Sequence, residues 1–454
     1  MGRLLKIVKP IGKFLTLPFT WLWGLIKSGT AGQLSRRAKR GLELFIVASV
    51  CGLLAWLNWQ LGLEKHLAGP PAFRKVWLGL VALILYATVR FTMLLFAQLP
   101  KHASQFPDIA KALQAGVDAA FEARVSLQDS PLFLVLGAEE SVEQAMVSSS
   151  FVGDRIKVDS NELPLHWHGD ADAVWLTAPG VSAVSQQYGR VRGAKNAASV
   201  QARLTVAEKK QARQRLQYMA QLIKKLRSPV VPLNGVLLLI PYQWMEDAEL
   251  SSMADTIKLD MATLQDAFGV KCMCCVIVHG IDQSKEFDAY IQSMPANARQ
   301  RRCGCTLPAF AEYDQADGKA LHGWLEEFLR QQVYRFYQAD RTRASNGRLF
   351  RLLRSFHAIE PGFCRVLNNA FPSDVEEKFY LAGVYLAALD GSTKTFFDGV
   401  AAKLTGDHDE CIGWNNQSLA KDRRTRRTAS TLAGTVVLLI TFNALLLSRM
   451  FFAW

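Results

Sequence analysis

The residues best placed for chemistry follow an apolar run, residues 131–137, and form the turn Gly137-Ala138-Glu139-Glu140-Ser141-Val142-Glu143-Gln144. In nucleotide-binding α/β domains, a glycine-rich loop after the first strand holds phosphates through its amides, a Lys and a Ser or Thr. Here Glu140 and Val142 replace the later glycines. Glu143 stands at the Lys position and Gln144 at the hydroxyl position.

Electrostatics argue against a nucleotide at this loop. Glu139, Glu140 and Glu143 would face the phosphates, and each repulsion at roughly 4–5 Å costs on the order of 1–4 kcal/mol. The missing Lys removes the usual attraction. We therefore expect no bound nucleotide and no other cofactor. The three carboxylates also suit Ca²⁺ or Mg²⁺, but acids favour the positive end of a helix, so we expect a solvated helix start.

A second candidate is His166-Trp167-His168, followed by Asp170. On a strand, the two His side chains share one face, as metal ligands can. The competing interpretation, which we favour here, is a polar surface strand or turn before Gly169.

The cysteines form two clusters, Cys272 with Cys274 and Cys275, and Cys303 with Cys305. Neither has the C-x-x-C spacing of a zinc site, and both are expected to be small buried hydrophobic residues. No Ser/His/Asp or Cys/His arrangement stands out. The sequence thus predicts no metal site, no catalytic residues and no enzyme.

Positive charge is concentrated beside apolar segments. The chain has 454 residues, half of them hydrophobic, and a formal net charge of +13. Residues 1–40 hold nine Lys and Arg and no acid, and residues 421–427 read KDRRTRR. Such charge next to apolar sequence is typical of contact with anionic lipid. We therefore expect a lipid bilayer as partner, and no nucleic acid.

Three apolar segments have lengths near the ~20 residues that cross a bilayer. They are residues 44–62, 76–98 and 431–447, and the first two form a hairpin around Gly69-Pro70-Pro71. The positive-inside rule places the N-terminus and residues 100–428 in the cytoplasm and the C-terminus across the membrane. Asn443 either bonds another helix or lies near one interface.

The part between the spans is expected to be α/β. Unbroken apolar runs at 131–137, 172–176, 235–240 and 272–279 are typical of a parallel sheet covered on both faces. Residues 205–227 have helical periodicity and end before Pro229. We expect a doubly wound α/β domain followed by helices, because residues 319–356 and 375–403 show mostly helical spacing.

The predicted organisation has five parts. They are a basic cytoplasmic or interfacial segment (1–40), a transmembrane hairpin (41–99), an α/β domain (100–306), a helical subdomain (307–428) and a C-terminal transmembrane helix (429–454).

Several stretches resemble, in order, motifs of the IcmF/TssM family, inner-membrane components of bacterial type VI secretion systems. They are SPLFLVLG (130–137), DAVWLTAPG (172–180), VPLNGVLLLI (231–240), VIVHGIDQ (276–283) and FYLAGVYLA (379–387). The resemblance implies a membrane hairpin, a cytoplasmic GTPase-like domain, a third membrane helix and then a large periplasmic region.

The sequence departs from the family at each nucleotide element. The phosphate loop lacks its Lys and Ser/Thr, and Leu176 replaces the Asp expected before Thr177. In the guanine-specificity stretch Asp282 remains, but His279 and Gly280 replace Thr and Lys. These departures favour a domain kept for its shape, not for hydrolysis.

The resemblance also implies partners. It predicts a non-catalytic scaffold that contacts a TssL-like inner-membrane protein and baseplate components, in a homo- or hetero-oligomer. The chain ends seven residues after the third expected span. We therefore expect the periplasmic region to be absent, and a separate periplasmic subunit would have to supply it. The rival hypotheses are an active membrane NTPase with an altered loop and a membrane-tethered regulator unrelated to secretion.

Overall fold

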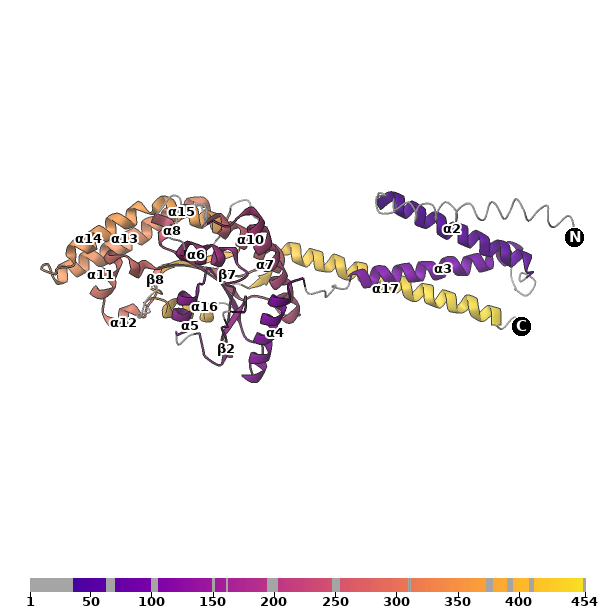
Figure 1. Ribbon diagram of the computed structural model, residues 1–454, viewed down its shortest axis with the longest axis horizontal. Helices are drawn as coiled ribbons and strands as arrows, with labels where there is room; N and C mark the ends of the chain where they lie inside the picture. Colours follow the sequence, from indigo (N-terminus) through magenta and orange to yellow (C-terminus); the bar gives the residue numbers. More distant parts are fainter. Residues whose placement is uncertain are drawn as a thin grey trace. The chain divides into compact units, whose positions relative to one another are not determined.

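The structure, a computed structural model, forms two compact units (Figure 1). It describes residues 36–62, 70–98, 105–148, 152–160, 162–193, 203–246, 254–308, 310, 312–372, 379–389, 395–407 and 412–451. We call residues 36–98 and 421–451 the helical unit, and residues 105–420 the α/β unit. Of the expected basic segment 1–40, residues 1–35 lie outside the described residues.

The helical unit begins with two antiparallel helices, α2 (Arg36–Gln60) and α3 (Pro71–Gln98). They approach closely where Gly79 faces α2, since a Cβ at Gly79 would lie 2.5 Å from the carbonyl oxygen of Cys51. Small residues permit such backbone contact between apolar helices. Near the turn, Asn58 donates from Nδ2 to the carbonyl oxygen of Lys75 at 3.0 Å.

The last helix, α17 (Asn416–Phe451), contributes its apolar half to the same unit. Leu439 packs against the buried pair Trp77 and Ile84 of α3. Asn443 Nδ2 donates to Thr88 Oγ1 at 3.4 Å and to the carbonyl oxygen of Leu439 at 2.9 Å. Of the two interpretations of Asn443, the structure therefore supports a bond to another helix.

Among the described residues, two helices are long and apolar enough to cross a membrane, Pro71–Leu94 and Asn416–Leu445. The apolar part of α2, Leu44–Gln60, is shorter than that criterion requires. Length and composition thus support two of the three expected spans and suggest membrane association. They do not fix an orientation.

The α/β unit is built on an eight-stranded sheet of order β2-β3-β4-β1-β5-β7-β9-β8. Strands β4, β1, β5, β7 and β9 are parallel, and β2, β3 and β8 are antiparallel to their neighbours. A small antiparallel pair joins β6 to β10. The bounds are β1 Leu132–Leu136, β2 Ile156–Val158, β3 His166–Gly169, β4 Val174–Thr177, β5 Gly235–Pro241, β6 Val270–Lys271, β7 Met273–His279, β8 Cys303–Thr306, β9 Tyr380–Leu386 and β10 Gly413–Trp414.

Helices cover both faces of this sheet, with α6 and α10 on one side and α5 and α16 on the other (Figure 1). This arrangement confirms the expected α/β class, in which the central strands are apolar throughout because both faces are buried. The helices are α4 Pro107–Glu122, α5 Glu140–Val147, α6 Ala183–Gly193, α7 Val206–Leu226, α8 Gln243–Glu246, α10 Asp255–Phe268, α11 Lys285–Ser293, α12 Ala296–Arg299, α13 Gln315–Ala339, α14 Asn346–Ala358, α15 Glu360–Ala370 and α16 Asp398–Asp407, with a 3₁₀ turn η5 at Ile281–Gln283.

The predicted bounds of one helix (205–227) and one strand (235–240) agree with the structure to within one residue. The predicted helix 205–227 is α7, which starts with a capping box between Thr205 and Glu208. In the motif VPLNGVLLLI, Asn234 Oδ1 accepts from the amide of Leu132 at 3.0 Å and from buried Arg227 at 3.2 Å. This side chain fixes the register of β5 against β1.

The expected helical subdomain needs a correction. Residues 380–386 form strand β9, which lies between β7 and β8. The run is buried on both faces, and an uninterrupted apolar run cannot be told from a buried helix by periodicity. The sheet therefore extends beyond the expected boundary at residue 306, and α13, α14 and α15 form an insertion between β8 and β9.

Replacing Gly79 by Leu should separate α2 from α3, because the new side chain would overlap the backbone of Cys51. We expect the alkylation rate of half-buried Cys51 in mild detergent to rise by roughly 10-fold. The matched control is Gly52→Leu, since a Cβ at Gly52 meets no atom within 4 Å. Equal rates in both variants would contradict the close packing at Gly79.

Candidate functional site

The loop after β1 is closed by backbone contacts. Gly137 has φ +80°, and a Cβ there would lie 2.0 Å from the carbonyl oxygen of Leu239. Its amide donates to Ser185 Oγ at 3.0 Å. In a phosphate-binding loop such an amide points to the ligand, whereas here it is bonded to helix α6.

The first acidic side chain of the loop is also bonded within the protein. Arg192, in the last turn of α6, binds Glu139 Oε2 at 2.7 Å and contacts the hydroxyl of Ser141. Glu140 and Gln144 are exposed on α5. Glu140 is therefore exposed at the start of the helix, as expected, whereas Glu139 forms an ion pair with Arg192.

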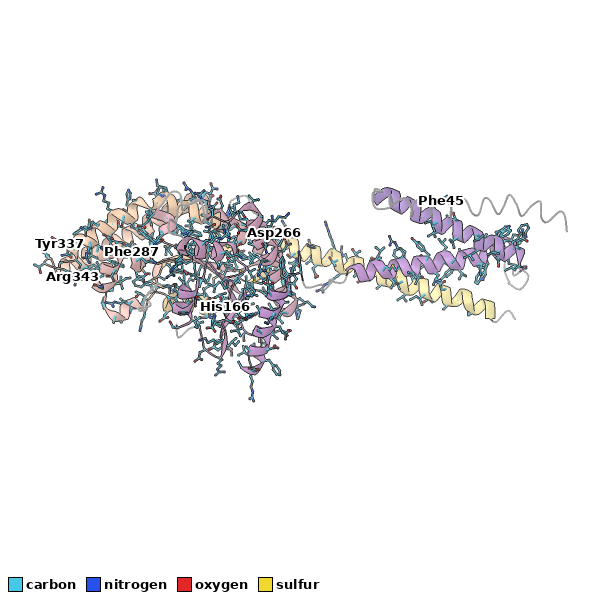
Figure 2. All side chains as sticks on the ribbon, in the orientation of Figure 1. Phe45, His166, Asp266, Phe287, Tyr337 and Arg343 are labelled. Carbon is cyan, nitrogen blue, oxygen red and sulfur yellow. The ribbon has the colours of Figure 1, made fainter. Side chains whose placement is uncertain are left out.

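Glu143 points into the core and is bound by three side chains. His166 Nδ1 lies 2.9 Å from Glu143 Oε2, and His168 Nε2 lies 2.8 Å from Oε1. The hydroxyl of Thr177 donates a short hydrogen bond to Oε1. His166 and His168 are buried, as is Glu143, with 4% of its surface exposed. Figure 2 labels His166 within the α/β unit.

Strand periodicity brings these groups together. His166 and His168 are two residues apart on β3 and so share the face on which α5 lies. Trp167 points to the other face, where its Nε1 donates to the carbonyl oxygen of Ala112 at 3.2 Å. Thr177 lies opposite His166 in the β3–β4 register. Helix α5 then delivers Glu143 from the first turn after the loop.

The cluster holds an anionic carboxylate beneath the surface. Burial alone would raise the pKa of Glu143, but the hydrogen bonds from His166 and His168 lower it to about 2. Burial likewise opposes protonation of His166, yet the hydrogen bond and charge of Glu143 raise the pKa of that imidazole. Glu143 and His166 thus favour each other's charged forms, as a buried ion pair does.

Two expectations are corrected by this geometry. His166-Trp167-His168 is a buried strand, not a polar surface strand, and Glu143 is buried, not solvated. From the sequence, the acids of the loop and the two histidines were separate candidate sites. Only the fold shows that a residue of α5 meets residues 23 and 25 positions later. A carboxylate at the Lys position and two imidazoles on one strand face were the available signal. Nothing in the sequence singled out Thr177 as their partner.

The other degenerate nucleotide positions are packed into the core. Leu176 is fully buried in β4. His279, at the end of β7, is also buried, and its ring meets Tyr188 of α6 edge-on with centroids 5.1 Å apart. Gly280 has φ +74°, and Asp282 is half-buried in η5.

The five cysteines of the two clusters are buried and form no disulfide bonds, as expected of small hydrophobic residues. Burial raises the pKa of Cys275 and of Cys303 to about 12. These groups are therefore thiols at neutral pH, and the thiolate is the form that binds metal.

A second buried carboxylate supports the N-terminus of α6. Asp260 of α10 accepts from Ser182 Oγ at 2.7 Å and from the amide of Val184 at 3.0 Å. The hydroxyl oxygen of Ser182 in turn accepts from the amide of Ser185, the residue that binds Gly137. Complete burial raises the pKa of Asp260 to about 6.

Comparison with known proteins found one family match, in the later part of the chain. Residues 209–429 match the family model described as IcmF-related N-terminal domain. Over this stretch the chain is similar to the IcmF-related N-terminal domain. The resemblance to the IcmF/TssM family is thereby confirmed, and the domain suggests an IcmF-like protein associated with type VI secretion. The loop 137–144 and the Glu143 cluster precede the matched residues. No curated protein and no solved structure matched the chain.

Replacing Glu143 by Gln should destabilise the α/β unit by about 3 kcal/mol or more, because it removes the charge that holds His166 and His168. The measurement is chemical denaturation of the detergent-solubilised chain in buffer with a chelator. Glu327→Gln is the control, since that carboxylate is exposed on α13. A loss no larger than that of the control would show that the cluster does not stabilise the fold.

Asp260 should give the protein a pH dependence of defined sign. Its pKa is raised from 3.8 to about 6 on folding, so its contribution to stability is full below pH 4. This contribution falls as the pH rises to about 6, by about 3 kcal/mol. The free energy of unfolding of wild type minus that of Asp260→Asn should decrease by this amount between pH 4 and pH 7.

The control for the pH experiment is Asp266→Asn, an exposed position on the same helix (Figure 2). Its difference from wild type should have no comparable slope. A wild-type-minus-Asp260→Asn difference that stayed flat, or rose with pH, would contradict a buried carboxyl with a raised pKa.

Proposed function

We propose that this protein is a non-catalytic inner-membrane scaffold of a type VI secretion membrane complex. In this proposal a GTPase-like domain recruits cytoplasmic partners without binding nucleotide. The observation that carries it is the position of Glu143. At the place where a phosphate loop has its Lys, this chain has a buried carboxylate bonded to His166, His168 and Thr177.

The topology supports a GTPase-like origin for the domain. The loop follows β1, a central strand between β4 and β5. Thr177 ends β4, and His279 ends β7, so all three nucleotide elements follow the carboxyl ends of parallel strands. Nucleotides bind at that edge in doubly wound sheets. Here Tyr188 packs on His279 at that edge, and the Glu143 cluster bonds Thr177 at the end of β4.

The proposed membrane arrangement has three spans in the bacterial inner membrane, formed by α2, α3 and the apolar part of α17. The basic residues before α2 and at 421–427 support a cytoplasmic N-terminus and a cytoplasmic α/β unit. The close contact at Gly79 and the Asn443–Thr88 hydrogen bond support packing of the three helices in lipid.

The partners proposed are a TssL-like inner-membrane protein and baseplate components. The test is affinity purification of the tagged protein from native membranes in mild detergent, followed by mass spectrometry. Near-stoichiometric recovery of such proteins supports the scaffold function. Intact protein without any secretion component would reject it in favour of a membrane-tethered regulator.

The absence of nucleotide binding is separately testable. GTP or ATP with Mg²⁺ should give no saturable binding at micromolar concentrations in equilibrium dialysis, because the Gly137 amide and the carboxylates of Glu139 and Glu143 are bonded within the protein. An authentic GTPase assayed in the same detergent serves as the positive control. Saturable binding that is lost in Ser141→Trp would instead support an active NTPase with an altered loop.

A further inference from the structure

The Glu143 cluster contains three groups that bind metal ions in other proteins. One oxygen of Glu143 and one ring nitrogen each of His166 and His168 lie within 4.8 Å of one another. All three side chains are buried, and they come from two elements, α5 and β3. No other such group of three occurs among the described residues.

The spacing is close to that of a metal's ligands. Tetrahedral zinc has ligands at about 2.0–2.2 Å, which places neighbouring ligand atoms about 3.3 Å apart. From Glu143 Oε1, His166 Nδ1 lies at 3.0 Å and His168 Nε2 at 2.8 Å. An ion among the three atoms would therefore need them to move apart by only a few tenths of an ångström. It would replace the two N–H donations to Glu143 with bonds to the ion.

We propose that Glu143, His166 and His168 bind a divalent transition-metal ion, with the Thr177 hydroxyl or a water as the remaining ligand. Two imidazoles and one carboxylate suit zinc and its neighbours, whereas calcium and magnesium prefer oxygen ligands alone. The bound ion ties the loop–α5 segment to β3. The burial of the site favours a structural ion over a catalytic one, which needs an open position.

A second histidine–carboxylate pair shows what distinguishes this cluster. His357 Nδ1 lies 3.0 Å from Glu326 Oε2, but His357 is exposed and Glu326 also binds Arg330. A single imidazole beside a guanidinium offers too few ligands for an ion. This pair is therefore the matched control for the experiments below.

The experiment uses the full chain in mild detergent, stripped with a chelator and then dialysed against zinc chloride. Metal content and affinity are measured by mass spectrometry of the metal and by calorimetry. We expect one zinc ion per chain and a higher unfolding temperature, since a ligand that binds only the folded state stabilises it.

Glu143→Gln and His168→Gln should each weaken zinc binding by about 100-fold, because each removes one of three protein ligands. Glu326→Gln and His357→Gln should bind zinc as wild type does. Zinc binding that survives both cluster variants, or wild-type chain that binds no zinc, would overturn the proposal.

Cobalt(II) keeps the test decisive if the cluster variants fail to fold. In wild-type protein, its visible spectrum should show ligand-field bands of nitrogen and oxygen ligands, without a thiolate charge-transfer band. A strong thiolate band would place the ion on the buried cysteines and overturn the assignment. The outcome is independent of the secretion role, since partner recovery and metal content are measured separately.

Discussion

The structure of the candidate site depends on one interaction, the bonding of the Glu143 carboxylate by two imidazoles and a hydroxyl. A buried carboxylate without partners would cost several kcal/mol. His166, His168 and Thr177 therefore have to lie where they do once Glu143 occupies the Lys position of the loop. Because α5 carries Glu143 and β3 carries both imidazoles, this one interaction also fixes the helix against the antiparallel edge of the sheet.

Contacts on the other side of the loop also hold the loop in place. Gly137 approaches β5 closely and donates its amide to Ser185, and Arg192 holds Glu139. Asp260 caps the start of α6, the helix that provides both Ser185 and Arg192. Nucleotide-dependent domains obtain much of this order from phosphates and a cation. Here protein groups supply it, which is consistent with a domain retained as a binding surface.

Much of the fold could be predicted from the sequence because its signals were local. The buried strands β1, β5 and β7 appear as unbroken apolar runs, and α7 was predicted from its helical periodicity and the Pro that follows it. Strand β9 was assigned to a helix, because an apolar run fits either a strand or a buried helix and residues 375–403 showed mostly helical spacing. The three apolar helices were found by length, although α2 falls short of the criterion that α3 and α17 meet.

The candidate site was harder to predict, since its contacts are not local. The sequence itself shows that the loop lacks its Lys and hydroxyl and that Leu176 replaces the acid expected before Thr177. It could not show where Glu143 points, and helix-dipole reasoning placed that side chain in solvent. Which face of α5 is buried follows from Val142 and Met146 packing on the sheet, and Glu143 lies between them in the first turn.

The most direct measurement is hydrogen–deuterium exchange of the peptide covering residues 137–147, in the full chain in detergent, with and without GTP and Mg²⁺. If protein contacts alone close the loop, its amides should exchange slowly in both conditions and at the same rate. Fast exchange that becomes slow when GTP is added would contradict the account, because it would mean that the loop is open and needs a nucleotide to close.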